Sequence, residues 1–261
     1  MDPKPRSDDL GNPRVALFVT CLVDAMRPQV GFASMALLDS AGCRVEVPVA
    51  QTCCGQPALN SGDRSGARRL AQATIALLEP YEFVVAPSGS CAATIRLHYP
   101  ELFIEEDPWL ARATALAART HELMSFLVDV RGWSPRGVAL DASATYHDSC
   151  SGLRELNVQS QPRRLLAAVD RLALRPLQDS TTCCGFGGTF CVKYAAISNA
   201  IVGEKVRNIQ AAGADLLLGG DLGCLMNMAG KLHRGGSKVR VFHAAELLAG
   251  MGTGPAIGEV P

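Results

Sequence analysis

The stretch Val15-Ala-Leu-Phe-Val-Thr-Cys21 decides the fold, because a short run of apolar, β-branched and aromatic residues stops there at a cysteine. Such a run predicts a buried strand. The run Phe83-Val-Val-Ala86 has the same character and leads into Pro87-Ser-Gly-Ser-Cys91. Between these runs, Cys43-Arg-Val-Glu-Val-Pro48 alternates apolar and polar residues, and it leads to the adjacent pair Cys53-Cys54. The first half therefore predicts strands that each end before a cysteine.

The cysteine order of the first half occurs again in the second half. Each set has a single cysteine, an adjacent pair and another single cysteine, with steps of 32 and 38 positions in the first half and 33 and 41 in the second. The sets are Cys21, Cys53, Cys54 and Cys91, and Cys150, Cys183, Cys184 and Cys224. Thr52 and Thr182 precede the two pairs. We interpret the chain as a duplicated module that holds two soft-metal centres.

Helical patterns separate the predicted strands. The predicted helices include residues 64–78, 162–169, 198–212 and 244–249, and the second-half strands are 144–147, 172–177, 215–218 and 239–242. Strands that alternate with helices imply right-handed crossovers and parallel sheets covered on both faces. We therefore expect an α/β protein of two pseudo-repeated modules. The cysteine motifs then lie at the C-terminal ends of the strands, where open α/β sheets bind ligands.

The expected modules cover residues 14–131 and 138–249. A connecting helix over residues 109–130 and a linker over residues 132–137 join them. Residues 1–13 and 250–261 are expected to form flexible tails, the second because it is rich in glycine and proline.

Composition narrows the function. Of the 261 residues 48% are hydrophobic, and 25 basic and 25 acidic residues give a net charge of zero, which favours neither nucleic acid nor an anionic membrane as a partner. No apolar run reaches the roughly 18 residues of a membrane span. The polar start Met1 to Pro13 lacks the apolar core of a signal peptide. We expect a cytoplasmic protein, in which cysteine patterns indicate metal binding or catalysis before disulfides.

The adjacent cysteine pair favours an iron–sulfur cluster over zinc. Neighbouring Cα atoms are about 3.8 Å apart, so two adjacent thiolates on one zinc ion form a strained ring, whereas the irons of a cluster offer separate positions. Zinc sites usually space paired cysteines by two to four residues. Glycines after the pairs permit a tight turn around a cluster, and these are Gly55, Gly185, Gly187 and Gly188. A zinc site and a thiol–disulfide function of the vicinal pair remain the alternatives.

These motifs resemble the cysteine-rich CCG domain, which occurs in pairs in one of the subunits of heterodisulfide reductase and in glycolate oxidase iron–sulfur subunits. From Val15 to Leu248 the chain is more similar to the lactate-utilization protein A family. The matching stretches include Cys53-Cys-Gly-Gln-Pro57, Tyr146-His-Asp-Ser-Cys150 and Cys183-Cys-Gly-Phe-Gly-Gly-Thr-Phe190. The resemblance implies an iron–sulfur subunit of a complex that oxidises L-lactate to pyruvate and carries electrons to a respiratory acceptor. It also implies two partners, a larger ferredoxin-like iron–sulfur subunit and a smaller third lactate-utilization protein.

The chain departs from one of these relatives at two positions. The CCG domains of heterodisulfide reductase have five cysteines per set, whereas Ser88 and Asp221 stand here three positions before Cys91 and Cys224. Four thiolates per set match an ordinary [4Fe–4S] cluster in number. The open alternatives are a glycolate or heterodisulfide-type redox subunit and a zinc-binding scaffold protein.

No catalytic residue is assigned from the sequence. His147 precedes Cys150 and is a candidate to tune a cluster or move a proton. Arg27, Arg154 and Lys193 follow cysteine motifs and are candidates to hold a substrate carboxylate, against the simpler interpretation of solvated surface charges. The two remaining cysteines are expected to lie outside the sets, as a core residue and an incidental thiol; they are Cys43 and Cys191.

Overall fold

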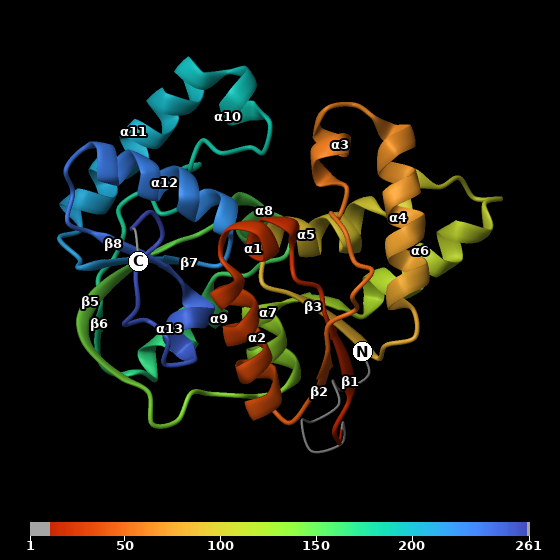
Figure 1. The fold of residues 1–261 in the computed structure, drawn as a ribbon, viewed down its shortest axis with the longest axis horizontal. Coiled ribbons are helices and arrows are strands. Elements are labelled where there is room, and N and C mark those ends of the chain that lie inside the picture. The colour runs from red at the N-terminus through yellow and green to blue at the C-terminus, as the bar shows by residue number, and fades with distance from the viewer. Residues whose placement is uncertain (1–10, 260–261) are drawn as a thin grey trace.

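The computed structural model describes residues 11–259 and contains two four-stranded parallel sheets, which confirms the predicted α/β class (Figure 1). The first sheet has the order β2-β1-β3-β4 and the second the order β6-β5-β7-β8. The strands of the first are β1 Arg14–Leu17, β2 Arg44–Glu46, β3 Phe83–Ala86 and β4 Thr120–Glu122. Those of the second are β5 Ala139–His147, β6 Asp170–Leu174, β7 Leu216–Gly219 and β8 Arg240–His243. The two sheets thus repeat one topology.

Helices follow the strands in the same order in both halves. The first half contains α1 Cys21–Met26, α2 Pro28–Ser40, α3 Gln56–Asn60, α4 Arg64–Leu78, α5 Gly89–Ala93, α6 Pro108–Ala118 and α7 Leu123–Ser125. Short π-helical turns at Thr94–His98 and Phe126–Val130 and a 3₁₀ turn at Pro100–Leu102 complete it. The second half contains α8 Cys150–Arg154, α9 Ser160–Ala167, α10 Phe190–Lys193, α11 Ala195–Ala211, α12 Leu222–Arg234 and α13 Ala244–Leu248.

The single connecting helix expected over residues 109–130 is wrong. The chain leaves α6 at Ala118 and forms β4, which pairs with β3 through Val84 and Thr120. Thr120, His121 and Glu122 carry no apolar run that would indicate a strand, but they lie at the free edge of the first sheet. Sheet pairing outweighs local propensity here, and β4 becomes the counterpart of β8.

The two halves pack together across an approximate two-fold relation. Helix α2 packs against α13, and its counterpart α9 packs against α7. In the same way α5 packs against α8, and α12 packs against α1. One hydrophobic cluster contains residues of both sheets, including Val15, Val85, Ala144 and Leu216. The boundaries 14–131 and 138–249 stay a prediction, since the two sheets share this core.

The segment after α13 lies against the rest of the protein, although a flexible tail was expected from residue 250. The Ile257 N–H donates to the Val241 carbonyl at 2.9 Å, and Ala256 is buried. The Arg27 side chain donates to the Pro255 carbonyl at 2.7 Å. Of the expected tails, residues 1–10 and 260–261 lie outside the described residues.

Among residues 11–259, no helix has both the length and the apolar character needed to cross a membrane.

Candidate metal centres

The segments that carry the two cysteine sets lie at the C-terminal edges of the two sheets, as predicted. Cys21 and Cys150 are the first residues of α1 and α8, directly after β1 and β5. Cys91 and Cys224 lie in the first turns of α5 and α12, after β3 and β7. The two pairs lie in the loops that follow β2 and β6. Parallel strands bring these segments to one edge because their carboxyl ends point the same way.

In the first set the four thiols are in contact in chain order. The Cys21 thiol is hydrogen-bonded to Cys53, and Cys53 to Cys54. The Cys54 and Cys91 Sγ atoms are 3.4 Å apart. Hydrogen bonds from the Cys21 and Cys54 thiols lower the pKa of the Cys53 thiol to about 2. The set is therefore a compact group of soft donors in which a thiolate is stabilised.

The second set repeats this arrangement. Hydrogen bonds join Cys150 to Cys183, Cys183 to Cys184, and Cys184 to Cys224. Those from the Cys150 and Cys184 thiols lower the pKa of the Cys183 thiol to about 2. Two groups of four thiols with the same internal contacts are what the sequence repeat predicts.

Backbone N–H groups surround both pairs. The Gly55 N–H donates to Cys53 Sγ at 3.4 Å, and the Gly185 N–H donates to Cys183 Sγ at 3.3 Å. The Phe186 N–H donates to Cys184 Sγ at 3.5 Å. Gly55 and Gly185 have φ values of 88° and 78°, which L-residues with a side chain rarely adopt. These turns present backbone donors to sulfur, and in iron–sulfur proteins such hydrogen bonds help to set the reduction potential.

The two further glycines support the second loop. Gly187 and Gly188 have φ values of 54° and 62°. A Cβ on Gly187 would lie 2.8 Å from the Phe190 Cβ, so this loop has no room for a side chain there. Both glycines line the pocket beside the second set. A direct role in holding a cofactor stays a prediction.

The other two cysteines lie apart from the sets. Cys43 is buried in the core that joins the two sheets. The Cys191 thiol donates to the Gly188 carbonyl at 3.2 Å. Neither is part of the thiol contacts described above, as the sequence led us to expect.

His147 lies beside the second set. Its ring and the thiols of Cys184 and Cys224 form a group whose ligand atoms all lie within 4.8 Å of one another. The side chain is 1% exposed, and within residues 11–259 neither ring nitrogen has a hydrogen-bond partner. Burial lowers its pKa to about 3, so the ring is neutral and carries one N–H. A buried N–H needs an acceptor, and a group bound to the nearby thiols or an ordered water would supply one.

The other candidate side chains are placed differently. The Arg154 guanidinium is 3.5 Å from the Thr181 carbonyl, in the loop that carries the second pair. Lys193 ends α10 and is exposed. Arg27 forms a 2.9 Å ion pair with Glu246, which is 1% exposed, so its charge is used within the fold. The positions of Arg154 and Lys193 therefore define no role for them. Arg27 is already paired with Glu246, so it is not placed to bind a substrate carboxylate.

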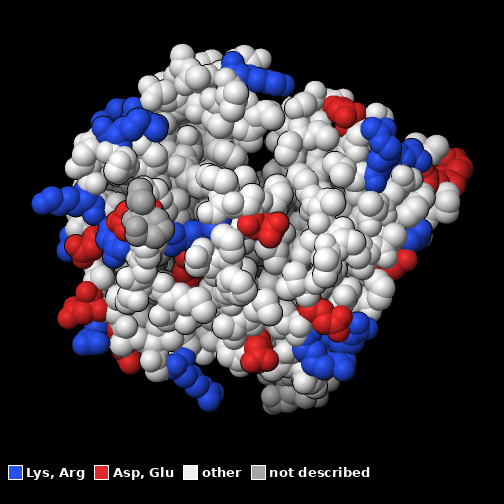
Figure 2. All heavy atoms as spheres, in the orientation of Figure 1, with Lys and Arg blue, Asp and Glu red and all other residues white. Residues whose placement is uncertain are grey.

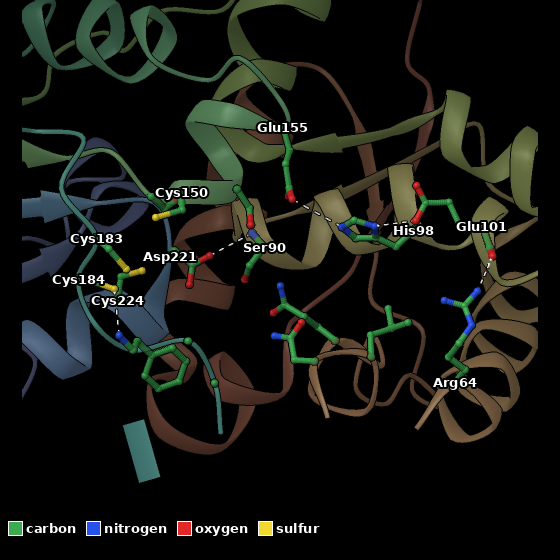
Figure 3. A pocket seen from close by; sticks show the side chains of 18 residues that line it. Arg64, Ser90, His98, Glu101, Cys150, Glu155, Cys183, Cys184, Asp221 and Cys224 are labelled. Atoms are coloured by element: carbon green, nitrogen blue, oxygen red, sulfur yellow. Dashed lines mark hydrogen bonds and ion pairs between the residues drawn. The ribbon is translucent and has the colours of Figure 1, made fainter. Parts of the chain in front are cut away.

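A pocket of about 420 Å³ opens on the second set (Figure 3). All four cysteines of the second set line it, and no cysteine of the first set does. Asn60, Arg64 and His98 of the first half also line it. His98 lies between two carboxylates, 3.2 Å from Glu101 and 3.6 Å from Glu155. Figure 2 shows the surface hollowed between the lobe with α10 and α11 and the lobe with α3 and α4, and its charges are scattered without a large patch of one sign. The volume is that of a small-molecule site.

Ser88 and Asp221 stand three positions before the last cysteine of their sets, and they are hydrogen-bonded to each other. The Ser88 hydroxyl donates to the Asp221 carboxylate at 3.1 Å, and the Ser90 N–H donates to the same oxygen at 3.1 Å. Both positions lie three residues before a cysteine of their set, one in each half. The contact links the loops of the two candidate centres across the two-fold relation.

The comparisons with known proteins agree with this duplicated arrangement. The CCG family, described as a cysteine-rich domain, matches residues 15–96 and 144–229. Lactate utilization protein A of Geobacillus kaustophilus is 47% identical over 235 residues, which are 90% of this chain and 98% of that protein. The chain belongs to the lactate utilization protein A family. The family member from Exiguobacterium sp. is 47% identical over 238 residues, 90% of this chain and 97% of that protein.

A solved structure supports the fold of this family member. A hypothetical protein from Helicobacter pylori aligns with a TM-score of 0.67 at 12% identity, over 98% of this chain and 57% of that chain. This chain therefore spans a little over half of that protein. The likeness concerns the fold alone.

Two residues at the second site were missed by the sequence analysis. Lys205 in α11 is fully buried, and its Nζ donates to the carbonyls of Asp179 and Ser180, just before the second pair. The sequence did contain one indication of this burial, because Lys205 lies on the apolar face of the helix between Val202 and Val206. The second residue is Asn227 in α12, whose side-chain amide donates to the Cys184 carbonyl at 2.8 Å.

Proposed function

We propose that this protein is the iron–sulfur subunit of a complex that oxidises L-lactate to pyruvate and carries the electrons to a respiratory acceptor. The observation that supports it most directly is the pair of equivalent four-thiol groups in a member of the lactate utilization protein A family. The name of its relatives supports lactate as the substrate of the system.

Each set would hold one cluster through its four thiolates, and four thiolates per centre match [4Fe–4S]. The donor set fits, since the thiols are soft, contiguous and supplied with backbone N–H groups at Gly55 and Gly185. Bound clusters supply one-electron redox chemistry. The residues of this chain donate hydrogen bonds to sulfur atoms of both sets. They also exclude water from Cys54 and Cys184, which are each 2% exposed.

Partners complete the proposal. A larger ferredoxin-like iron–sulfur subunit and a smaller third lactate-utilization protein would work with this chain in the cytoplasm. The pocket beside the second set offers a place for a small molecule next to its thiols. The pocket is lined by both carboxylates and cations, so its charge alone does not select lactate over another ligand.

The test is the iron and acid-labile sulfide content of protein purified without oxygen, with EPR spectra before and after dithionite. We expect iron and sulfide in equal amounts, enough for two clusters, and a signal on reduction. Protein that contains zinc and no acid-labile sulfide would contradict the proposal and indicate a zinc-binding scaffold protein instead. Growth of a deletion strain on L-lactate, compared with glycolate, then tests the substrate.

Single substitutions test the ligand assignment. Cys53→Ala is expected to remove the first cluster and Cys183→Ala the second, because each takes the central thiol from its set. Cys43→Ala is the matched control, since this buried cysteine lies in the core and outside both sets. Iron content that stays unchanged after both set substitutions would contradict the assignment.

A further inference from the structure

The two candidate centres have the same thiols but different surroundings. Three residues before the first cysteine of each set, the first half has Phe18 and the second half has His147. Both side chains are buried. The repeat therefore replaces an apolar ring by one that carries an N–H at the second centre.

A second replacement concerns the helix that covers each site. The buried residues of α4 and α11 match at an offset of 131 positions, which aligns Ala71 with Val202, Ile75 with Val206 and Leu78 with Ile209. The same alignment places Lys205 opposite Thr74, and both are buried. A cation in the second half thus takes the place of a neutral hydroxyl in the first.

The Lys205 ammonium is held close to the second set. Its Nζ donates to the Ser180 carbonyl at 2.7 Å and to the Asp179 carbonyl at 3.2 Å. The side chain is fully buried, and its charge acts on the thiols of Cys184, Cys150 and Cys224. A charge in this poorly solvated position is weakly screened.

Two carboxylates, those of Asp148 and Asp221, also lie near the second set. Asp148 is neutralised by Arg163, whose guanidinium donates to both carboxylate oxygens at 2.7 Å. Asp221 faces the first half as well, because it accepts hydrogen bonds from Ser88 and Ser90. Its charge acts on the Cys224 thiol in the sense opposite to Lys205, and its hydrogen bond from the Ser90 N–H places it next to Cys91 of the first set as well.

At the first set, the positions that correspond to His147 and Lys205 hold neutral residues. Phe18 and Thr74 carry no charge, and the Tyr99 hydroxyl donates to the Cys54 carbonyl at 2.8 Å. In the described part of the chain, the pKa values of Cys21, Cys53 and Cys54 are shifted by neighbouring thiols, burial and backbone N–H groups.

We propose that Lys205 and His147 hold the cluster of the second set at a higher reduction potential than the cluster of the first set. Reduction adds negative charge to a cluster, so a nearby cation and an N–H donor stabilise the reduced form more than the oxidised form. The proposal rests on the iron–sulfur part of the proposed function.

The proposed difference in reduction potential determines where an electron resides in the protein. The second set lines the pocket of about 420 Å³, whereas the first set lies outside that lining. In partly reduced protein the electron resides at the centre next to the pocket. The second centre is therefore the one poised to exchange electrons with a molecule or partner that reaches this hollow.

An EPR-monitored redox titration of the anaerobically purified full chain tests which of the two clusters has the higher reduction potential. We expect two reduction steps. Cys183→Ala should abolish the step at higher potential, and Cys53→Ala the step at lower potential. The reverse assignment, or one shared midpoint for both clusters in the wild type, would overturn the inference. Absence of iron and sulfide in the wild type would instead refute the proposed function itself.

Three variants test whether Lys205 and His147 cause the difference in reduction potential. Lys205→Met keeps the length of the side chain and removes the charge, and His147→Phe restores the residue type of the first centre. Each is expected to shift the higher midpoint towards the lower one, without moving the lower midpoint. Thr74→Val is the matched control at the first centre and should leave the higher midpoint unchanged. A higher midpoint that stays in place in both variants with full iron content would overturn the assignment to these residues. If a variant loses iron, the order of the wild-type steps still decides the proposal.

Discussion

Gly185 shows how one residue determines the shape of a candidate centre. Its φ of 78° lies in the left-handed region, and a Cβ at this position would lie 2.8 Å from the Ser198 carbonyl oxygen. The Ser198 hydroxyl in turn donates to the Gly185 carbonyl at 2.8 Å, which fixes the loop to α11. The turn that directs an N–H to Cys183 therefore has no place for a side chain.

Gly185→Ala is expected to lower the iron content of the second centre and to leave the first centre intact. The substitution costs about 1 kcal/mol in backbone strain alone, and the contact with Ser198 adds to it. Gly137→Ala is the control, because Gly137 also has a positive φ, 69°, but its Cβ would meet nothing within 4 Å. Iron analysis and EPR of the two variants check this. Equal iron in both would show that the close contact has no role.

At the level of elements, a buried ion pair helps to join the two halves. Arg27 stands between α1 and α2 and binds Glu246 of α13 at 2.9 Å. The Glu246 carboxylate also accepts the His243 N–H at 3.0 Å, which completes the N-terminal cap of α13. A buried carboxylate of this kind is strongly destabilising if the cation paired with it is removed.

Arg27→Met is expected to destabilise the protein by roughly 3–5 kcal/mol, because it leaves the Glu246 charge buried without a partner. Arg112→Met is the control, since the Arg112–Glu79 pair has a similar distance of 2.8 Å but both side chains are exposed; it should cost less than about 1 kcal/mol. Denaturant unfolding of both variants measures the difference. Equal costs would mean that burial of Glu246 does not matter.

The elements also show what the sequence could predict. The helix over residues 64–78 and the strand over 83–86 have the predicted bounds, because each has a clear apolar period and defined ends. Strand β4 was missed, because Thr120, His121 and Glu122 become a strand only through pairing with β3. The cysteine sets were predicted from spacing. The roles of Lys205 and Asn227 depend on contacts between distant segments, which local patterns do not contain.

At the scale of the molecule, the two halves exchange contacts at the ends of their last strands. His243, at the end of β8, lies with its Nε2 3.2 Å from the Pro87 carbonyl of the first half. Its counterpart Glu122, at the end of β4, lies beside Gly220 and Tyr146 of the second half. Burial raises the pKa of Glu122 to about 7. The interface therefore contains a carboxyl group that favours its neutral form.

This carboxyl group should make the stability depend on pH. Because its pKa in the folded state is raised from 4.5, the stabilisation is complete below about pH 4.5 and is lost as the pH rises through about 7. Glu122→Gln stays neutral, so its stability relative to the wild type is expected to rise by about 1 kcal/mol between about pH 6 and about pH 8. Denaturant unfolding at the two pH values measures the change. A constant difference between variant and wild type would contradict it.

The reciprocal contacts between the halves have a consequence for how far the two sites can differ. They are the contacts that two copies of one module make in a symmetric homodimer, where each interaction occurs twice. In such a dimer both centres carry the same side chains by necessity. In a single chain the two halves can differ, so that one position holds Lys205 while its counterpart holds Thr74. The covalent link between the halves is therefore what permits two unlike sites in this symmetric arrangement.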